Sequence, residues 1–391
     1  TVNDYTKGDV PTAVDASTAG IRALLALPAA APDAAGGLPI SDAGELDMDA
    51  LAKAGDAMAL TSGERTTLKG RRTLHVAKTG DDGNDGLALA TAKLTVGGAI
   101  AAATDGDEII VHANATAYTE SAMSLASLSG VTLRIMRGTT ITSGETTVLA
   151  LGESCSVCGG GKLISTKASG GIAVYATDKN NLSIEDVWIV SSDMAIVLAN
   201  CTNIRITNIA IDSAEYGVWV TGDSDNLAMD NCFVTLSGWT VCAAVGVTYT
   251  GSLGRITNCD IGVSVPFADG NHIPIGIESY GGSTDSLLIE HCNIQATALT
   301  GDYAYGVYAT GGKTNLWNCR IESTADSNTI DIFNDGANSI TIADSHYSTT
   351  TGTITRLDPT VDASGNAYAD VKLVKTVDAD TAISARVDAS V

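Results

Sequence analysis

Carboxyl groups and aromatic rings in the C-terminal half of this sequence are of the types that bind and cleave carbohydrates. Two carboxyl groups held roughly 5–10 Å apart can act as acid and base in glycoside cleavage. The candidate catalytic residues are Glu278, Asp269 and Asp302. Aromatic faces stack on sugar rings, while polar groups bond to the hydroxyls. The candidate glycan-binding residues are Trp219, Trp239, His272, Tyr303 and Tyr308.

Each of these assignments has a plainer alternative. The chain contains 45 Asp and Glu residues, so acidic pairs arise often without catalytic meaning. Outward Trp and Tyr side chains on a sheet also serve as strand formers or pack against a neighbouring subunit. Histidines such as His272 and His291 lie on a loop or on the coil surface more often than they act as a base. Binding, lateral packing and no special role therefore all remain open.

A repeated pattern positions these residues. The template has eight successive positions: apolar or small, any residue, apolar, any residue, polar, Cys, any residue and apolar. Its clearest copies span residues 227–234, 254–261, 287–294 and 314–321. The Cys position recurs at Val187, Ile209, Cys232, Cys259, Cys292, Cys319 and Ser345, in steps of 22, 23, 27, 33, 27 and 26 residues. A unit of this size that returns in register predicts a stacked coil.

A second column of apolar residues returns with a similar period. It runs through Ile172, Ile196, Val218, Val247, Ile277, Val307 and Ile332, five of which follow a glycine. Each period contains two apolar segments, in which apolar and polar residues alternate and between which Gly, Asn or Asp occurs. This pattern favours β-strands over helices. Stacking buries their apolar faces at about 4.8 Å per coil. The predicted fold is all-β, a right-handed parallel β-helix.

Three consecutive coils carry insertions at one corner. The interval between the two columns is 7 residues from Ile211 to Val218, but 13 from Val234 to Val247 and 16 from Ile261 to Ile277. We expect these loops to stack into a ridge beside an outward row of side chains. That row is Trp219, Thr248, Glu278, Tyr308 and Phe333.

The cysteines and the charge limit the function classes. Four of the eight cysteines share one inward column, which predicts buried free thiols and folding in a reducing cytosol. The pair Cys155 and Cys158 lacks a partner pair at zinc spacing, so no metal is expected there. A net charge of −23 argues against nucleic acid, and no apolar run approaches membrane-spanning length. We expect no cofactor.

The segment at residues 71–125 is predicted to close the end of the coil. A strand at residues 74–77, an Asp/Gly turn at 80–86, an apolar helix at 90–103 and a strand at 108–112 follow one another. This order resembles the opening of pectin-lyase-like β-helix proteins, in which a capping helix covers the coil end. Asp81, Asp82, Asn84 and Asp85 look loosely like a calcium loop, but a structural turn is favoured because the ligand spacing and closing Glu are missing.

The N-terminal region is predicted to be an attachment segment. Residues 29–51, rich in Ala, Pro, Gly and Asp, resemble a segment of bacteriophage tail-fibre and tail-associated proteins. The expected regions are a partly helical attachment region at 1–70, the opening strand and capping helix at 71–125, the β-helix at 126–357 and an extended C-terminal segment at 358–391.

The resemblance implies a structural or receptor-binding tail-fibre or tailspike protein. It further implies a homotrimer in the virion, assembled in the host cytoplasm, with other tail proteins bound through the N-terminal region and host-surface polysaccharide as a possible ligand. A polysaccharide depolymerase, a hydrolase or a lyase, is the main alternative, and a bacterial surface adhesin is a weaker one. The Gly-His-Gly and Arg-Ile-Lys motifs of polygalacturonases do not occur, which argues against the best-known enzymes of this fold. A protein without enzymatic activity is favoured, and a depolymerase stays open.

Overall fold

The computed structural model describes residues 71–213, 215–237, 243–265, 273–282, 285–298, 303–325, 328–335, 339–351, 354–356 and 375–377. All of them fall in one compact unit that begins at Arg71. The predicted attachment region at residues 1–70 lies outside the described residues.

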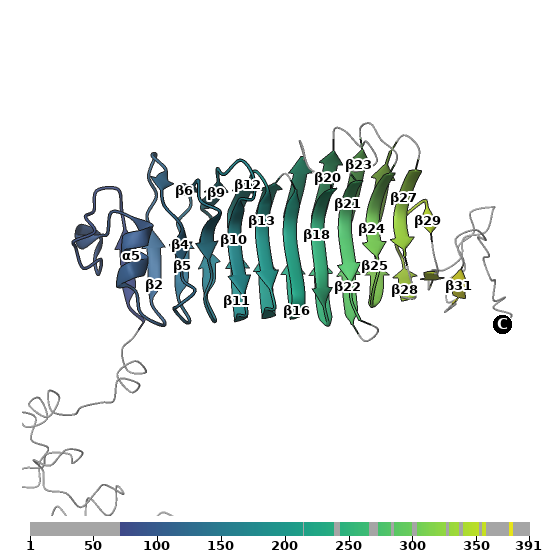
Figure 1. Cartoon of the computed structure of the whole chain (residues 1–391), viewed down its shortest axis with the longest axis horizontal. Helices are drawn as coiled ribbons and strands as arrows, with labels where there is room; N and C mark the ends of the chain where they lie inside the picture. Colours follow the sequence, from purple (N-terminus) through teal and green to yellow (C-terminus); the bar gives the residue numbers. More distant parts are fainter. Residues whose placement is uncertain are drawn as a thin grey trace, which may run out of the picture. The chain divides into compact units, whose positions relative to one another are not determined.

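The chain winds through three parallel sheets, and Figure 1 shows successive coils stacked side by side in chain order. Sheet I contains β1 (Thr73–Val76), β2 (Glu108–Val111), β5 (Thr132–Ile135), β8 (Ser156–Cys158), β11 (Asn180–Glu185), β14 (Thr202–Thr207), the second half of β16 (Tyr216–Asp230), β19 (Leu253–Thr257), β22 (Ser286–Glu290), β25 (Lys313–Trp317), β28 (Ser339–Ala343) and β30 (Ile354–Arg356).

The other two sheets complete each coil. Sheet II contains β3 (Tyr118–Thr119), β6 (Thr140–Ser143), β9 (Lys162–Ser165), β12 (Trp188–Ser191), β15 (Ala210–Ser213), β17 (Phe233–Ser237), β20 (Asp260–Val265), β23 (Asn293–Ala298) and β26 (Arg320–Thr324). Sheet III contains β4 (Met123–Ser124), β7 (Thr147–Ala150), β10 (Ile172–Thr177), β13 (Met194–Ala199), the first half of β16, β18 (Ala243–Gly251), β21 (Ile273–Tyr280), β24 (Tyr303–Ala309), β27 (Asn328–Asn334) and β29 (Thr350–Thr351).

This architecture confirms the predicted right-handed parallel β-helix. It corrects one feature, because most coils have three strands where the sequence pattern predicted two. The eight-residue template is not a single strand: residues 227–230 end β16 in sheet I, and Phe233 already begins β17 in sheet II. Between them Asn231 takes a positive φ of 52°, which turns the chain from one sheet to the next.

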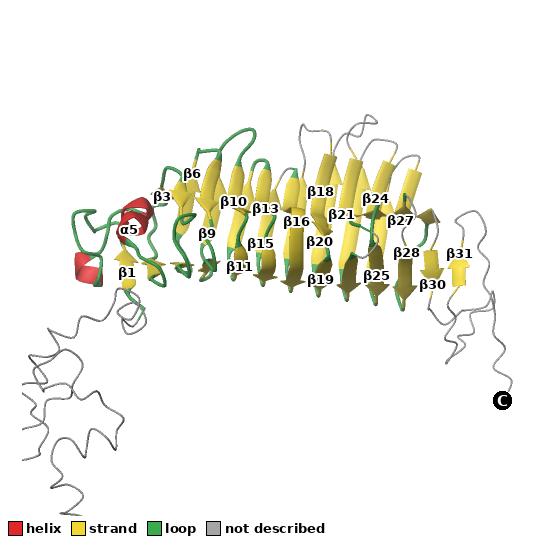
Figure 2. Cartoon of the chain, turned by 60° about the horizontal axis from the view of Figure 1, so that its bottom comes forward, coloured by secondary structure: helices red, strands yellow, loops and turns green. Residues whose placement is uncertain are grey.

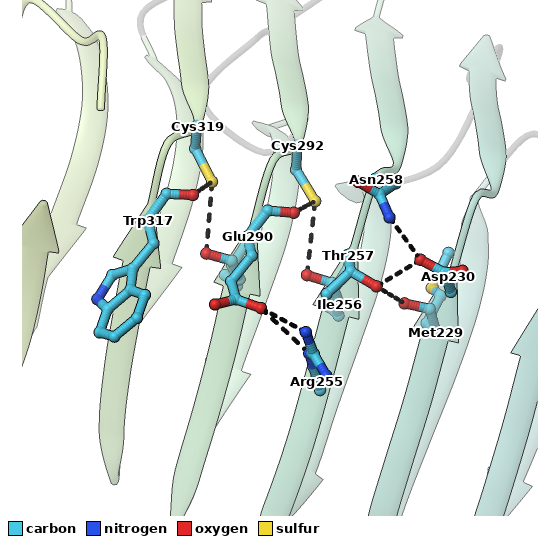
Figure 3. A network of polar contacts seen from close by, with 11 residues as sticks. Met229, Asp230, Arg255, Ile256, Thr257, Asn258, Glu290, Cys292, Trp317 and Cys319 are labelled. Carbon is cyan, nitrogen blue, oxygen red and sulfur yellow. Dashed lines mark hydrogen bonds and ion pairs between the residues drawn. The ribbon is translucent and has the colours of Figure 1, made fainter. Parts of the chain in front are cut away.

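The polar position of the template is the corner of the coil. Asn208, Asn231, Asn258, His291 and Asn318 all have φ between 50° and 55°. Asn tolerates this left-handed conformation better than most residues, which explains its recurrence there. The corner side chains also bond between coils: the Asn231 amide donates to Asn208 at 3.0 Å. Figure 3 shows the next pair, in which Asn258 donates to Asp230 at 2.8 Å.

The apolar core lies inside the coils, and the cysteine column belongs to it. Cys232, Cys259, Cys292 and Cys319 are each at most 3% exposed, and all four are free thiols. Figure 3 shows Cys292 and Cys319 pointing inward; their Sγ atoms contact the carbonyls of Ile256 and Ile289 in the preceding coil at 3.6 and 3.4 Å. The prediction of buried, unpaired thiols in this column is confirmed.

The N-terminal end of the coil is closed by a shorter helix than predicted. Instead of one helix over residues 90–103, the structure has a 3-10 turn, η1 (Leu89–Thr91), and a helix, α5 (Val96–Ala102). The carboxylate of Asp82 accepts hydrogen bonds from the backbone N–H groups of Leu94 and Thr95, both at 2.9 Å, which holds the intervening chain extended. Glu120 accepts from the backbone of Val96 at 2.9 Å and so anchors α5 to the first coils.

The Asp-rich turn before this helix is held by its own side chains. Asp81 accepts from Gly83 N at 2.7 Å, and Asp85 accepts from Leu87 N at 3.0 Å. The amide of Asn84 donates to the Ala92 carbonyl at 3.1 Å. These bonds agree with the interpretation as a structural turn.

The last described segment pairs with the end of the coil. β31 (Lys375–Val377) lies antiparallel to β30, with Thr355 opposite Thr376. The sequence predicted an extended C-terminal segment at 358–391; its three described residues form this strand, and the rest of the segment lies outside the described part. Within the described ranges no helix has the length and apolarity needed to cross a bilayer.

Candidate functional site

The outer surface of sheet III carries the row of side chains that the sequence predicted. Trp219 lies opposite Thr248, Thr248 opposite Glu278, Glu278 opposite Tyr308, and Tyr308 opposite Phe333 in the strand register. In Figure 2 the strands that carry them lie side by side. Because neighbouring strands are about 4.8 Å apart, five coils present one continuous row.

Aromatic rings pack against one another along this row. At one end, Tyr216 stacks on Trp219 with ring centroids 4.8 Å apart. At the other end, Tyr308 stacks on Phe333 at 5.1 Å and contacts Tyr305 at 5.2 Å. We call the outward residues Tyr216, Trp219, Thr248, Glu278, Tyr280, Tyr303, Tyr305, Tyr308 and Phe333 the aromatic face.

A second outward row supports these rings from beneath. Tyr216, Val245, Ile275, Tyr305 and Ile330 lie opposite one another in successive strands. Val245 and Ile275 are only 2% and 7% exposed and form an apolar cluster separate from the interior of the coil. The aromatic face is therefore a packed layer on the outside of the β-helix, in which rotation of the rings is restricted.

Glu278 is the only carboxyl group of the described aromatic face, and it lies between the two groups of rings. Its side chain is 9% exposed. The hydroxyl of Tyr280 donates to Oε1 at 2.6 Å, and the hydroxyl of Thr248 donates to Oε2 at 3.2 Å. Burial raises the pKa of Glu278 above its usual value, with the two hydroxyl bonds opposing that shift. The group is thus oriented, and more easily protonated than a surface glutamate.

Tyr308 is oriented by a neighbouring acid. Its hydroxyl donates to Asp335 at 3.0 Å. Burial, together with that bond, raises the pKa of Tyr308 to about 12, so the phenol stays protonated at neutral pH. Tyr303 and Tyr280 are the most exposed rings of the face, at 38% and 39%.

Four of the candidate residues belong to segments outside the described part of the chain. Trp239, Asp269, His272 and Asp302 lie outside the described residues, as do the loops that were predicted to form a ridge. The remaining candidates, Trp219, Glu278, Tyr303 and Tyr308, all lie on the aromatic face. The described part of the chain therefore brings the aromatic candidates together around one of the three proposed carboxyl groups.

A pair of neighbouring carboxyl groups was not among the candidates predicted from the sequence. Asp193 and Glu215 lie at the start of sheet III in consecutive coils. They directly precede Met194 and Tyr216, which lie opposite each other in the strand register. Asp193 is 6% exposed, and the backbone of Gly170 donates to its Oδ2. Burial, and then the contact with Asp193, raise the pKa of Glu215 to about 8. The available signal was the spacing of 22 residues, which equals one coil.

This pair predicts a pH-dependent stability. The folded pKa of Glu215 exceeds its unfolded value of about 4.5, so its protonation stabilises the fold fully below that value, and this stabilisation is lost as the pH rises through about 8. Because Glu215 is half-exposed, solvent screening reduces the expected loss to about 1 kcal/mol. Urea denaturation at pH 5 and pH 9 should show a lower midpoint at pH 9.

Glu215→Gln is the matched variant, because its amide can donate to Asp193 at every pH. We expect this substitution to remove most of the difference between the two midpoints. An equally large difference in the variant would mean that other groups cause it.

The described residues offer little for a metal ion. No group of three His, Cys, Asp or Glu side chains gathers as a metal site in the part of the chain that the structure places. Cys155 is buried and Cys158 half-buried, both as free thiols on or beside β8. The aromatic face can stack on flat or cyclic ligands, and Glu278 can form hydrogen bonds with their hydroxyl groups.

No protein-family model matches the chain, and no curated protein matches it. Among solved structures it is similar to pectin methylesterase PemA from Erwinia chrysanthemi, with a TM-score of 0.41 and 11% sequence identity. The similarity covers 60% of this chain and 89% of that one. At this level of identity it concerns the course of the backbone alone.

Proposed function

We propose that this chain is a structural, receptor-binding tail-fibre or tailspike protein of a phage-like particle, and that its aromatic face binds a host-surface polysaccharide. The observation that carries the binding part is the row of packed rings around the oriented carboxyl group of Glu278. The resemblance of residues 29–51 to tail-associated proteins supports the particle part. In this proposal the N-terminal region binds other tail proteins.

The geometry suits an extended sugar chain better than a small compact ligand. Trp219 and Phe333 are four strands apart in the register, so the row is roughly 19 Å long at 4.8 Å per strand. Rings at both ends can stack on the apolar faces of sugar units, while Glu278 and Tyr280 near the middle bond to hydroxyl groups. Ordered rings lose little side-chain entropy on binding, which favours affinity.

Tyr308→Ala is expected to weaken glycan binding about tenfold or more, because it removes one stacking ring and exposes Phe333. The measurement is a binding titration with purified surface polysaccharide of the host. Trp317→Ala is the control, since Trp317 is a 47% exposed ring on sheet I, away from the aromatic face. Equal affinity of the native chain and Tyr308→Ala would contradict the assignment of this face.

Lateral packing in a homotrimer is the competing role for the same face. Sedimentation of the full chain distinguishes the two roles. If the face packs against a sister chain, Tyr308→Ala lowers the trimer fraction; if it binds glycan, the trimer fraction stays as in the native chain. A native chain that sediments as a monomer would count against the tailspike proposal as a whole.

A polysaccharide depolymerase is the second candidate function, and the raised pKa of Glu278 is the observation that favours it. A carboxyl whose pKa is raised by burial is better suited to act as a general acid than a surface carboxyl. Glu278→Gln should then abolish glycan cleavage while leaving the fold intact, whereas a binding protein releases no reducing sugar in either form. Asp193 and Glu215 do not fit a two-carboxyl glycosidase, because they touch and leave no room for the sugar bond.

A bacterial surface adhesin is the weaker third candidate. It would use the same aromatic face but would lack tail proteins as partners. The presence of the protein on purified particles, probed by antibody, separates it from the tail-fibre proposal.

A further inference from the structure

A pocket at the N-terminal end of the β-helix has an unusual charge for this molecule. Its volume is about 440 Å³, within the range of roughly 300–1,000 Å³ typical of small-molecule sites. Its basic lining residues are Lys78, His112 and Arg137. The chain as a whole has 45 acidic and 22 basic residues, yet no carboxyl group lines the pocket among the described residues.

The topology places these residues together. β1, β2 and β5 are adjacent parallel strands, with Val76 opposite Val111 and Val111 opposite Ile135. Lys78, His112 and Arg137 each follow the end of one of these strands by one or two residues. The carboxyl ends of parallel strands meet at one edge of a sheet, so three positions far apart in sequence become neighbours.

Lys78 and Arg137 supply positive charge that the described residues do not neutralise. Two other arginines of this region are paired, Arg72 with Asp107 and Arg134 with Glu108. The ammonium of Lys78 lies 4.5 Å from the centroid of the Tyr118 ring, a cation–π contact that holds the side chain over the pocket. Arg137 is exposed and forms no ion pair with a described acid.

A histidine pair gives the pocket a rigid polar wall. Nδ1 of His75 and Nε2 of His112 are 2.9 Å apart and share a hydrogen bond. Burial, and then the neighbouring His75, lower the pKa of His112, so His112 is neutral at pH 7. The Tyr118 hydroxyl donates to the His112 carbonyl at 2.9 Å, which fixes the base of the pocket.

The rim of the pocket is apolar. Leu89 and Met136 line it and are 56% and 39% exposed, among the most exposed large apolar side chains of the described residues. Two cations and two exposed apolar side chains in one lining match a ligand with an anionic head and an apolar body.

From this arrangement we propose that the pocket binds a small organic anion, whose carboxylate or phosphate lies between Lys78 and Arg137 and whose apolar part contacts Leu89 and Met136. Arg137 presents a planar fork that can bond to two oxygens of either group, and Lys78 adds a point charge. Asn114, also in the lining, is a further hydrogen-bond donor. The site is separate from the aromatic face, so this proposal is independent of the proposed glycan binding.

The test is calorimetric titration of the full chain at low salt with four probes. Benzoate and phenyl phosphate carry both parts of the proposed ligand and differ in the anionic group. Inorganic phosphate lacks the apolar part, and benzyl alcohol lacks the charge. We expect saturable binding of benzoate or phenyl phosphate, at least tenfold weaker binding of inorganic phosphate, and none of benzyl alcohol.

Substitutions connect the binding to this pocket. Arg137→Gln and Lys78→Gln should each weaken binding about tenfold or more, because each removes a charge-assisted hydrogen bond. Lys313→Gln, which removes an exposed lysine from β25, is the charge-matched control and should bind normally. Met136→Ala should weaken phenyl phosphate but not inorganic phosphate.

Three results would overturn the proposal. The first is no saturable binding of either organic anion. The second is equal affinity for inorganic phosphate, which would remove the apolar contact. The third is equal weakening by Lys313→Gln and Arg137→Gln, which would mean that net charge rather than this pocket determines binding.

Discussion

Gly276→Val is expected to destabilise the β-helix by more than about 3 kcal/mol, enough to unfold several coils. A Cβ atom at Gly276 would lie 2.3 Å from Cγ2 of Ile294 in sheet II and 2.5 Å from the carbonyl oxygen of Gly306 in the next coil. One of these neighbours is backbone in a parallel ladder and cannot move without breaking strand pairing. The free energy of unfolding, from urea denaturation followed by circular dichroism, measures the effect.

Gly262→Ala is the matched control for this prediction. Gly262 lies in β20, and a Cβ atom there has only the Val234 carbonyl at 4.0 Å as a neighbour. We expect this variant to unfold at the same urea concentration as the native chain, or a slightly higher one. If both glycine variants lose stability equally, the close contact between coils is not the cause.

Asp331→Ala is expected to cost about 3 kcal/mol or more and to loosen the last coils first. The side chain of Asp331 is 1% exposed. Oδ1 accepts from the backbone and hydroxyl of Ser323, both at 2.7 Å. Oδ2 accepts from the hydroxyl of Ser348 at 2.8 Å and from the backbone of Thr349 at 3.1 Å. Removal of the carboxylate leaves the buried donors of Ser323 and the partly buried donors of Ser348 and Thr349 without this partner.

Hydrogen exchange locates the effect of this substitution. Backbone amides of β26, β27 and β29 should exchange faster in Asp331→Ala, while those of β10 and β13 should not change. Glu322→Gln, which neutralises an acid of β26 that pairs with Arg320 at the surface, is the control and should change little. Uniformly faster exchange along the whole chain would contradict a local role for Asp331.

The repeat pattern predicts the position of Asp331 in the coil but not its hydrogen bonds. Its position was visible in the sequence, because Ile332 continues the second apolar column and Asp331 replaces the glycine that precedes Val247, Ile277 and Val307. Its role was not visible. The segment containing Ser348 and Thr349 follows the last full template, and only the folded coil brings its backbone donors to the Asp331 carboxylate.

The aromatic face was accessible from the sequence for a related reason. Trp219, Glu278, Tyr308 and Phe333 follow the inward column by one residue in successive coils, and alternation along a strand then places them outside. The ring contacts, the burial of Glu278 and its bonds to Tyr280 and Thr248 depend on side-chain rotamers and on the second outward row. Those features could not be read from spacing.

The sequence by itself determined the parallel β-helix, the inward cysteine column and the outward row of sheet III, because a two-residue alternation and a recurring period encode which way each side chain faces. The tertiary structure decided the third strand of most coils, the contact of Asp193 with Glu215, the bonds of Asp331 and the basic pocket at β1, β2 and β5. These features arise where strand ends and corners from different coils meet. Their contacts depend on the turn geometry at each corner, which an alternating pattern does not contain.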